Sequence, residues 1–286
     1  MSSPKVWFIT GSNSGFGRSL AEAVLAKGDK LVATTRHPED VQDLANKYAE
    51  QVKIAELDIT NADQISSAID TAITTFGGVD VLVNNAGYGT LGAVEEISDE
   101  KVRKQFEVNC FGTLNLIKGF LPHFRQRQSG HILNVSSVGG VAAFAGTGIY
   151  CSTKFAIEGY SEALAQEVAP LGIKMTLVEP GSFRTDFAGS SLSTADSTID
   201  AYKDTAHKFV KTAQETSGQQ PGDPDKAAQA MIDVVYSENP PLRLILGEDA
   251  LEGVRNKIES IQKDMDAWED VSRNMAFPGV ETASLG

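Results

Sequence analysis

The chain has 286 residues, 41% of them hydrophobic and 22% charged, which is typical of a folded globular protein and excludes a largely disordered or membrane-embedded one. At this length we expect a single α/β domain spanning residues 1–286. The net charge of −13 argues against a nucleic-acid-binding surface, which needs clustered Lys and Arg. Two cysteines and four scattered histidines predict neither a disulfide framework nor a metal site. The opening residues resemble no secretion or organelle signal, so we expect a cytoplasmic location.

Short apolar runs alternate with amphipathic stretches of helical period through a core of about residues 5–247. This alternation predicts an α/β, doubly wound Rossmann fold, in which a seven-stranded parallel sheet is flanked by helices on both faces. The expected strands are Val6–Thr10, Lys30–Thr35, Val52–Leu57, Val79–Asn84, His131–Ser136, Lys174–Glu179 and Leu242–Leu246.

The helices between these strands have recognisable ends. Expected helices are Arg18–Lys27, Pro38–Ala49, about 99–126 with Ser98 as N-cap, and about Tyr150–Ala169. Residues 186–222, rich in Ser, Thr, Asp, Gly and Gln, interrupt the alternation, and we expect either a lid over a site or a solvated excursion with a helix of its own. A polar helical stretch, Glu248–Trp268, leads into a tail ending at residue 286.

A glycine-rich turn joins the first strand to the first helix. Gly11, Gly15 and Gly17 stand where the backbone has to approach a ligand closely, and the helix N-terminus offers unpaired N–H groups. A dinucleotide pyrophosphate fits this turn, although any strand-to-helix turn can use glycine. The spacing differs from Gly-x-Gly-x-x-Gly, the fingerprint of most dinucleotide folds.

The end of the second strand bears on the choice of nicotinamide cofactor. It reads Thr34-Thr35-Arg36-His37, with no carboxylate where an NAD-binding acid is expected. Arg36 can hold the 2′-phosphate of NADP by charge-assisted hydrogen bonds, or it can be a solvated turn residue ahead of Pro38. We expect NADP(H).

Three further segments place polar side chains at the carboxyl edge of the sheet, where open α/β sheets bind ligands. Asn84-Asn85-Ala86-Gly87 ends the fourth expected strand, and Ser137 follows the fifth. Tyr150 and Lys154 are four residues apart, so both project from one face of a helix. An ammonium group there can stabilise the phenolate and lower the pKa of the tyrosine, unless the two are a surface pair.

Together these motifs resemble the short-chain dehydrogenase/reductase family, in its single-domain Rossmann branch and its hydroxysteroid- and retinol-dehydrogenase-like subgroup. The resemblance covers roughly residues 5–247. It rests on Thr10-Gly11-x-x-x-Gly15-x-Gly17, Asp58, Asn84-Asn85-Ala86-Gly87, Asn109, Ser137, Tyr150-x-x-x-Lys154 and Pro180-Gly181 with Thr185.

The resemblance implies a role for each matching residue. Tyr150 would act as general acid and base, and Lys154 would lower its pKa and hold the nicotinamide ribose. Ser137 would bind the substrate oxygen, and Asn109 would hold a water that links Lys154 to solvent. Cofactor contacts are implied for Gly11, Ser12, Asn13, Ser14, Gly15, Phe16, Gly17, Thr35, Arg36, Asp58, Ile59, Asn85, Ala86, Gly87, Tyr150, Lys154, Pro180, Gly181, Phe183 and Thr185.

The implied activity is hydride transfer between NADP(H) and a carbonyl or alcohol, as in a carbonyl reductase for a fairly apolar ketone or aldehyde. Phe144, Phe183 and Phe187 are candidates for an apolar substrate wall, or for ordinary core residues. Oxidation of an alcohol would use the same residues, and a non-catalytic NADP(H)-sensing protein is the alternative from another class. By family analogy we expect a homodimer or homotetramer that pairs through the helices at about 99–126 and 150–169.

Overall fold

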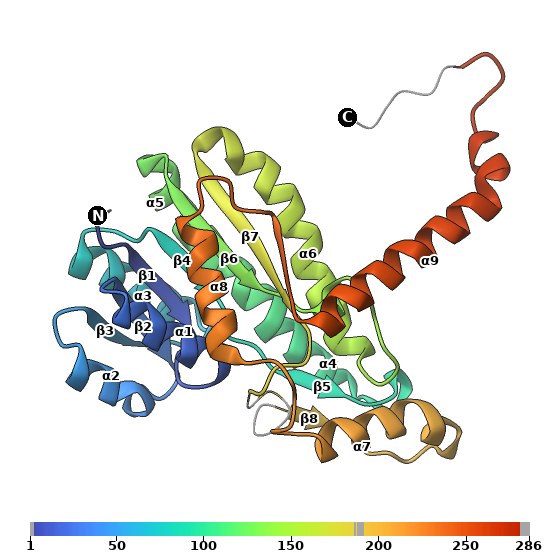
Figure 1. Cartoon of the computed structure of the whole chain (residues 1–286), viewed down its shortest axis with the longest axis horizontal. Helices are drawn as coiled ribbons and strands as arrows, with labels where there is room; N and C mark the ends of the chain where they lie inside the picture. Colours follow the sequence, from blue (N-terminus) through green and yellow to red (C-terminus); the bar gives the residue numbers. More distant parts are fainter. Residues whose placement is uncertain (1–2, 186, 188–191, 281–286) are drawn as a thin grey trace.

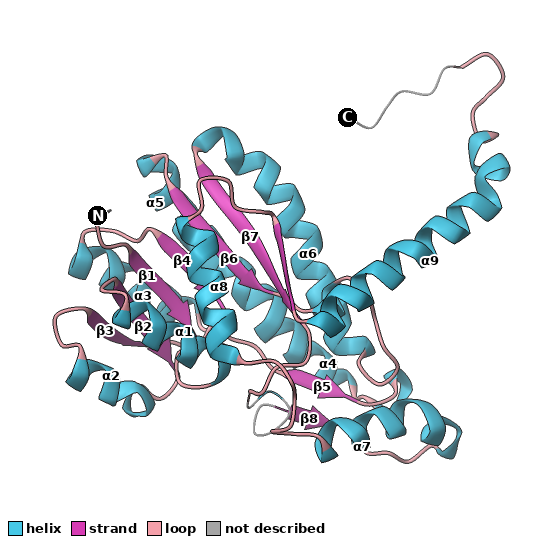
Figure 2. Cartoon of the chain, viewed as in Figure 1, coloured by secondary structure: helices cyan, strands magenta, loops and turns pink. Residues whose placement is uncertain are grey.

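A parallel sheet of seven strands forms the centre of the computed structural model, which describes residues 3–185, 187 and 192–280 (Figures 1 and 2). The strand order is β3-β2-β1-β4-β6-β7-β9. The strands are β1 (Val6–Thr10), β2 (Lys30–Thr35), β3 (Val52–Glu56), β4 (Val81–Asn84), β6 (Gly130–Val135), β7 (Ile173–Pro180) and β9 (Arg243–Leu246). This confirms the doubly wound fold and all seven expected strands, with ends that differ by at most two residues.

Helices cover both faces of the sheet. One core cluster joins the strands to α1 (Gly15–Ala26), α2 (Gln42–Lys47) and α8 (Pro224–Tyr236). The cluster on the opposite face joins them to α3 (Ala62–Phe76), α5 (Thr113–Arg127) and α6 (Gly148–Val168). The two layers hold the strand ends in fixed relative positions, and the candidate site is built on those ends.

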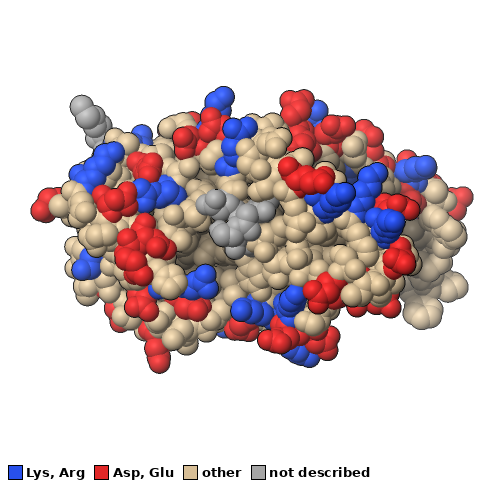
Figure 3. Space-filling model, turned by 90° about the horizontal axis from the view of Figure 1, so that it is seen from below, with Lys and Arg blue, Asp and Glu red and all other residues tan. Residues whose placement is uncertain are grey.

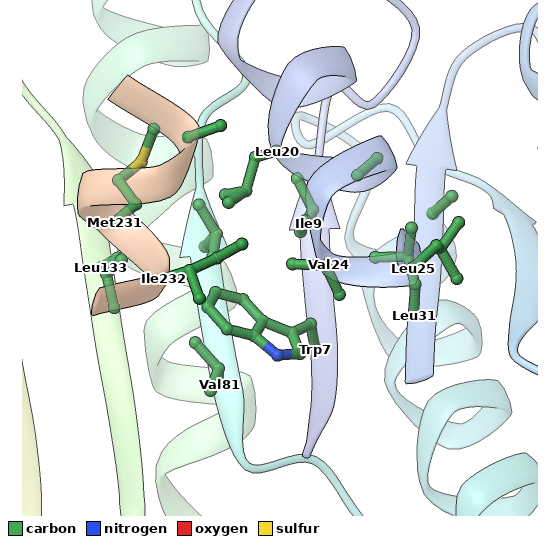
Figure 4. Close-up of a cluster of buried hydrophobic side chains, with 14 of the residues drawn as sticks. Trp7, Ile9, Leu20, Val24, Leu25, Leu31, Val81, Leu133, Met231 and Ile232 are labelled. Atoms are coloured by element: carbon green, nitrogen blue, oxygen red, sulfur yellow. The ribbon is translucent and has the colours of Figure 1, made fainter. Parts of the chain in front are cut away.

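Alternate residues of each strand enter opposite core clusters, as the pleat of a strand requires. In β1, Trp7 and Ile9 pack toward α1 and α8, as Figure 4 shows, whereas Val6 and Phe8 pack on the other face. Every residue of β1 is buried, which explains why the strand reads as a continuous apolar run rather than an alternating one.

Two expected helices are less regular than their sequence patterns predict. The stretch expected as Pro38–Ala49 consists of a 3₁₀ turn, Pro38–Val41, followed by the short α2. The stretch expected as one helix over 99–126 consists of α4 (Asp99–Phe106), a π-helical turn at Glu107–Gly112, and α5. In both cases consecutive helical segments cover most or all of the residues of the expected helix.

Backbone hydrogen bonds join the two ends of the excursion after β7, the segment at residues 186–222. Arg184 N donates to Gly222 O (2.9 Å), and Gly222 N donates to Ser182 O (3.0 Å). Within the excursion, β8 (Leu192–Thr194) pairs in parallel with β5 (Gly89–Leu91), and α7 (Lys208–Glu215) follows. Residues 186 and 188–191 of the expected insertion lie outside the described residues. The segment thus has a helix of its own and lies at the carboxyl edge of the sheet (Figure 1).

The last helix, α9 (Glu248–Arg273), continues beyond its expected end at Trp268 and extends away from the sheet (Figure 1). Among the described residues, no helix is both long and apolar enough to cross a membrane. The organisation as one domain stays a prediction.

Candidate active site

The turn between β1 and α1 is shaped by close backbone approach. A side chain at Gly17 would lie 2.1 Å from Gly11 O and 2.5 Å from Asn85 Nδ2, so only glycine fits there. Gly15 has φ +51, in the left-handed region that glycine adopts without strain. Gly17 is therefore required by the lack of space for a side chain, and Gly15 is favoured by its backbone conformation.

The start of α1 is suited to an anion. Ser14, the N-cap residue, makes no side-chain capping bond, and the first turn carries no acidic residue. Unpaired N–H groups and the helix dipole there favour a negatively charged group. A cleft of about 420 Å³ opens beside this turn, and its lining includes Asn13, Ser14, Gly15, Arg184 and Thr185.

Ser12 has a supporting position in the same turn. Its side chain is buried; Oγ donates to Ile9 O (2.9 Å) and accepts from Thr34 N (3.3 Å), and its own N–H donates to Thr34 O (2.9 Å). Because these groups are already used, Ser12 fixes the turn against β2 and offers no free N–H to a ligand.

The Asn85 side chain holds the glycine turn from the other side. Its Nδ2 donates to Thr10 O (2.9 Å) and Gly11 O (3.1 Å). The backbone N–H groups of Asn85 and Ala86 both donate to Thr10 Oγ1 at 2.9 Å. The segment that follows β4 therefore positions the turn that follows β1.

Arg36 is exposed directly after the buried Thr35 and forms no ion pair with any described residue. Its charge also acts on Asp58: burial opposes ionisation of that carboxyl group, but hydrogen bonds from Thr60 and the charges of Arg36 and Lys104 hold its pKa below the usual value. At the glycine-rich turn, Asn13 Nδ2 donates to the carboxylate of Asp40 (3.2 Å). The neighbouring Ile59 is buried against Gly112, so its side chain belongs to the core.

Helix α6 carries Tyr150 in its first turn and Lys154 one turn later. Lys154 is buried, with 6% of its surface exposed, and its Nζ donates to Val135 O (2.8 Å). This ammonium lies 5.8 Å from the centre of the Tyr150 ring. The interaction with a strand carbonyl fixes the lysine head under the ring, and Tyr150 and Lys154 are not a surface pair.

Ser137 lies beside Tyr150 at the end of β6. Its Oγ accepts from Gly139 N (3.0 Å) and caps the turn Val138–Gly140. Burial raises the pKa of Tyr150 above its usual value, while a hydrogen bond with Ser137 opposes the shift. This net direction is the opposite of the one expected from the lysine, because desolvation of the phenolate is the largest effect.

Burial also acts on Lys154 and lowers its pKa to about 8, against the charge of Glu158, which raises it. Glu158 is one helical turn beyond Lys154 and is buried together with Glu179. Both carboxylates pair with Arg243 of β9. Sequence reasoning missed this cluster, although the spacing of four from Lys154 to Glu158 is a signal that can be read from the sequence.

Asn109 lies in the π-helical turn and is almost fully buried. Its Nδ2 donates to Tyr88 O (2.8 Å) and Thr153 Oγ1 (3.2 Å), and its Oδ1 accepts from Tyr88 N (3.1 Å). The side chain thus joins the chain after β4 to α6. A π-helical turn widens the helix locally and is frequent at functional sites.

The three candidate phenylalanines have different surroundings. Phe187 contacts Tyr150, with ring centres 5.1 Å apart. Phe183 instead packs edge-on against Phe16 at 5.1 Å and joins the α1–α8 core. Phe144 is 42% exposed. Of the three, Phe187 is the one that covers the tyrosine.

The segment after β7 lies against the glycine turn. Thr185 Cβ would be 3.3 Å from a side-chain carbon placed on Gly15, and Gly181 N donates to Leu246 O (2.9 Å). Ser182 N donates to Asp249 of α9 (2.7 Å). Figure 3 shows the carboxyl edge from below: the surface is hollowed near its centre, with charged residues around the hollow. Among the described residues, no group of three or more His, Cys, Asp or Glu side chains could hold a metal ion.

Comparison with known proteins agrees with this arrangement. The model of the short chain dehydrogenase family matches residues 5–196. The chain belongs to this family. It is 40% identical to "Oxidoreductase BOA17" of Botryotinia fuckeliana over 94% of this chain and 98% of that protein. It is 36% identical to "3-ketodihydrosphingosine reductase" of Bacteroides thetaiotaomicron, over 85% of this chain and 88% of that protein.

Solved structures share the fold. A short-chain dehydrogenase from Streptomyces avermitilis superposes with a TM-score of 0.90 at 41% identity, covering 96% of this chain and 100% of that one. An alcohol dehydrogenase from Thermococcus sibiricus complexed with 5-hydroxy-NADP has a TM-score of 0.71 at 25% identity, with 85% and 96% covered. A 3-ketoacyl-(acyl-carrier-protein) reductase from Brucella melitensis complexed with NADH has 0.70 at 26%, with 85% and 95% covered. The chain is thus an oxidoreductase of this family, whose structural relatives bind nicotinamide cofactors.

Proposed function

We propose that this protein transfers a hydride between NADP(H) and a carbonyl or alcohol, with Tyr150 as the acid and base. The observation that carries the proposal is the meeting of Ser137, Tyr150 and the buried Lys154 at the carboxyl edge of the sheet, beside an uncapped helix N-terminus. Relatives named as oxidoreductases support it.

The residues present fit a dinucleotide. In the proposal the turn Gly11–Gly17 holds the pyrophosphate through backbone N–H groups, with Ser12 as its support, and Arg36 holds the 2′-phosphate. Asp58 and the backbone of Ile59 contact the adenine, and Asn85, Ala86 and Gly87 contact the adenosine side. The carboxamide lies against Pro180, Gly181, the backbone of Phe183, and Thr185. Lys154 and Tyr150 hold the nicotinamide ribose. The bound nicotinamide supplies or accepts the hydride.

The side chains of this chain manage the proton. In reduction, Tyr150 Oη donates a proton to the substrate oxygen, and Ser137 Oγ orients that oxygen by a hydrogen bond. A neutral phenol is the form needed for this step, and the raised pKa of Tyr150 favours it. The positive charge of Lys154 stabilises the phenolate as it forms. Asn109 holds α6 and the chain after β4 in position for a water relay.

We propose a fairly apolar substrate. Phe187 packs on Tyr150, and mainly uncharged residues face the hollow at this edge (Figure 3). The Bacteroides relative is named "3-ketodihydrosphingosine reductase", and this name supports a ketone as the substrate. Three expectations stay predictions: the subgroup, the cytoplasmic location, and pairing through the helices at 99–126 and 150–169. Phe111 and Phe155 lie on these helices and are 48% and 43% exposed.

The test is the variant Tyr150→Phe, assayed with a panel of apolar ketones and aldehydes while NADPH absorbance is followed. Loss of the proton donor is expected to reduce turnover by about 10²–10⁴-fold. NADPH affinity, measured by fluorescence titration, is expected to stay nearly unchanged. Tyr160→Phe is the matched control, because it removes the same hydroxyl from the same helix outside the site.

Unchanged turnover in Tyr150→Phe would rule out the mechanism. A wild-type protein that binds NADPH yet turns over no member of the panel, in either direction, would favour the alternative of a cofactor-sensing protein. Turnover only from alcohol to carbonyl would assign the oxidative direction to the same residues.

Cofactor preference is tested with Arg36→Ala. Loss of one charge-assisted hydrogen bond, worth about 1.5 kcal/mol, is expected to raise the KM for NADPH about tenfold. The KM for NADH, which has no 2′-phosphate, should not change. Arg125→Ala, an exposed arginine of α5, is the control. An equal loss with both cofactors, or a wild type that prefers NADH, would refute this role.

A further inference from the structure

Most of α9 has no partner in the described chain. Ala250 and Val254, near its start, are buried, and beyond them the helix extends away from the body (Figure 1). Its apolar residues there are strongly exposed: Ile258 59%, Ile261 46%, Met265 59% and Trp268 65%. A contiguous apolar surface of this kind on a folded chain marks an interaction site.

The apolar residues of α9 form one seam. Leu251, Val254, Ile258, Ile261, Met265 and Trp268 follow one another at alternating intervals of three and four residues. This interval is the heptad pattern of two helices that pack along their length. The seam begins at residues that touch the body and continues into the exposed part.

The charges beside the seam favour an antiparallel partner of the same sequence. The midpoint of the seam falls between Ile258 and Ile261. Lys257 and Asp264 lie on one flank of the seam, Lys257 before this midpoint and Asp264 after it. In a two-fold antiparallel pair, like flanks face each other, so Lys257 of each copy lies beside Asp264 of the other. In a parallel pair, Asp264 would instead face Glu269 of the other copy and repel it.

We propose that α9 is an association arm that pairs antiparallel with α9 of a second copy of this chain. The seam then places Ile258 of each copy against Ile261 of the other in the central layers. Met265 and Trp268 of each copy reach the start of the other α9, where Leu251 is 36% exposed and Val254 is buried against its own body. The contact is separate from the helices at 99–126 and 150–169, and it does not depend on the proposed activity.

A lipid surface fits this helix less well. In α9, Asp and Glu outnumber Lys and Arg by eight to four. Helices that lie on membranes instead carry a polar face rich in Lys and Arg, which anionic headgroups attract. A second copy requires no such charge.

The experiment measures the mass of the full chain by sedimentation velocity over a range of concentrations. Ile261→Glu buries a charge in the seam and is expected to reduce the assembly mass by half. Lys263→Ser, on the face opposite the seam, is the control and should leave the mass unchanged. Helix content by circular dichroism and turnover per subunit confirm that each variant is folded.

Charge exchange tests the orientation. Asp264→Lys is expected to weaken association, because it faces Lys257 of the other copy, and Lys257→Glu/Asp264→Lys is expected to restore it. Stronger association in Asp264→Lys would indicate a parallel pair and overturn the proposal.

Two other outcomes overturn the proposal as well: a wild type that stays at its monomer mass of 30.5 kDa, or a mass that Ile261→Glu does not change. Flotation of the wild type, but not of Ile261→Glu, with phosphatidylserine vesicles, without self-association, would assign the arm to a membrane instead.

Discussion

Lys154 shares the buried side of α6 with the carboxylate of Glu158, one helical turn further on. Burial raises the pKa of Glu158 to about 7, and the charge of Glu179 adds to this, while Ser136 and Arg243 oppose it. Arg243 also binds Glu179 at 2.6 Å, so three charged groups form a cluster beneath the lysine. The charge of Lys154 therefore depends on Glu158, whose own charge depends on Glu179 and Arg243.

The variant Glu158→Gln tests this dependence. As pH rises, Lys154, with a pKa of about 8, loses its proton before Tyr150, whose pKa is raised. Because the negative charge of Glu158 raises the pKa of Lys154, its removal lowers that pKa further. The alkaline limb of the kcat/KM profile is therefore expected to move to lower pH.

Glu162→Gln is the matched control for that profile. Glu162 also pairs with Arg243, but it lies two turns from Lys154 and is half exposed. An unchanged alkaline limb in Glu158→Gln, or the same shift in both variants, would mean that Glu158 has only a structural role.

Among the elements, the turn Val94–Glu96 holds the excursion after β7 through two glutamates, and Glu95 accepts from Tyr202 Oη (2.5 Å). Glu96 accepts from the backbone N–H groups of Thr198 and Ile199 and lies 2.8 Å from His207 Nε2. Burial opposes its ionisation, but these hydrogen bonds hold the pKa of Glu96 below its usual value. Glu96 thus makes three of the polar contacts that attach the excursion to the edge of the fold, beside the bond from Lys101 Nζ to Thr194 O (2.7 Å).

Glu96→Ala is expected to release this attachment. Amide hydrogen exchange in residues 198–207 should become at least about tenfold faster, since local opening costs less free energy without these bonds. The substrate KM should rise more than kcat falls. Glu100→Ala, an exposed residue of α4, serves as the control. Unchanged exchange would show that the remaining contacts, the pairing of β5 with β8 and the bonds of Glu95 and Lys101, are sufficient to hold the excursion.

For the whole molecule, the sequence predicted the strands that lie deep in the sheet, because burial on both faces produces long apolar runs. It also predicted Ser137 at the carboxyl edge of the sheet and Tyr150 with Lys154 on one face of a helix, and the family resemblance implied that the three act together. It missed β5 and β8, which have three residues each and pair about a hundred residues apart. Segments that short carry no readable period.

The electrostatics were the hardest to predict. Arg243 and Glu158 are separated by 85 positions in the chain, and no local pattern joins them. The upward shift in the pKa of Tyr150 comes from burial, which depends on how α6, β6 and Phe187 pack together. The break at Glu107–Gly112 is likewise invisible in hydrophobic spacing, which continues through it.

The backbone bonds between Ser182, Arg184 and Gly222 have a consequence for how such proteins can diverge. Because they fix both ends of the excursion to each other, residues between them can be lengthened, shortened or exchanged while β7 and α8 keep their places. The entropy of a longer loop grows only slowly with its length. Under the proposed function, new substrate preferences can therefore arise by exchange of this one segment, while Ser137, Tyr150 and Lys154 keep their positions.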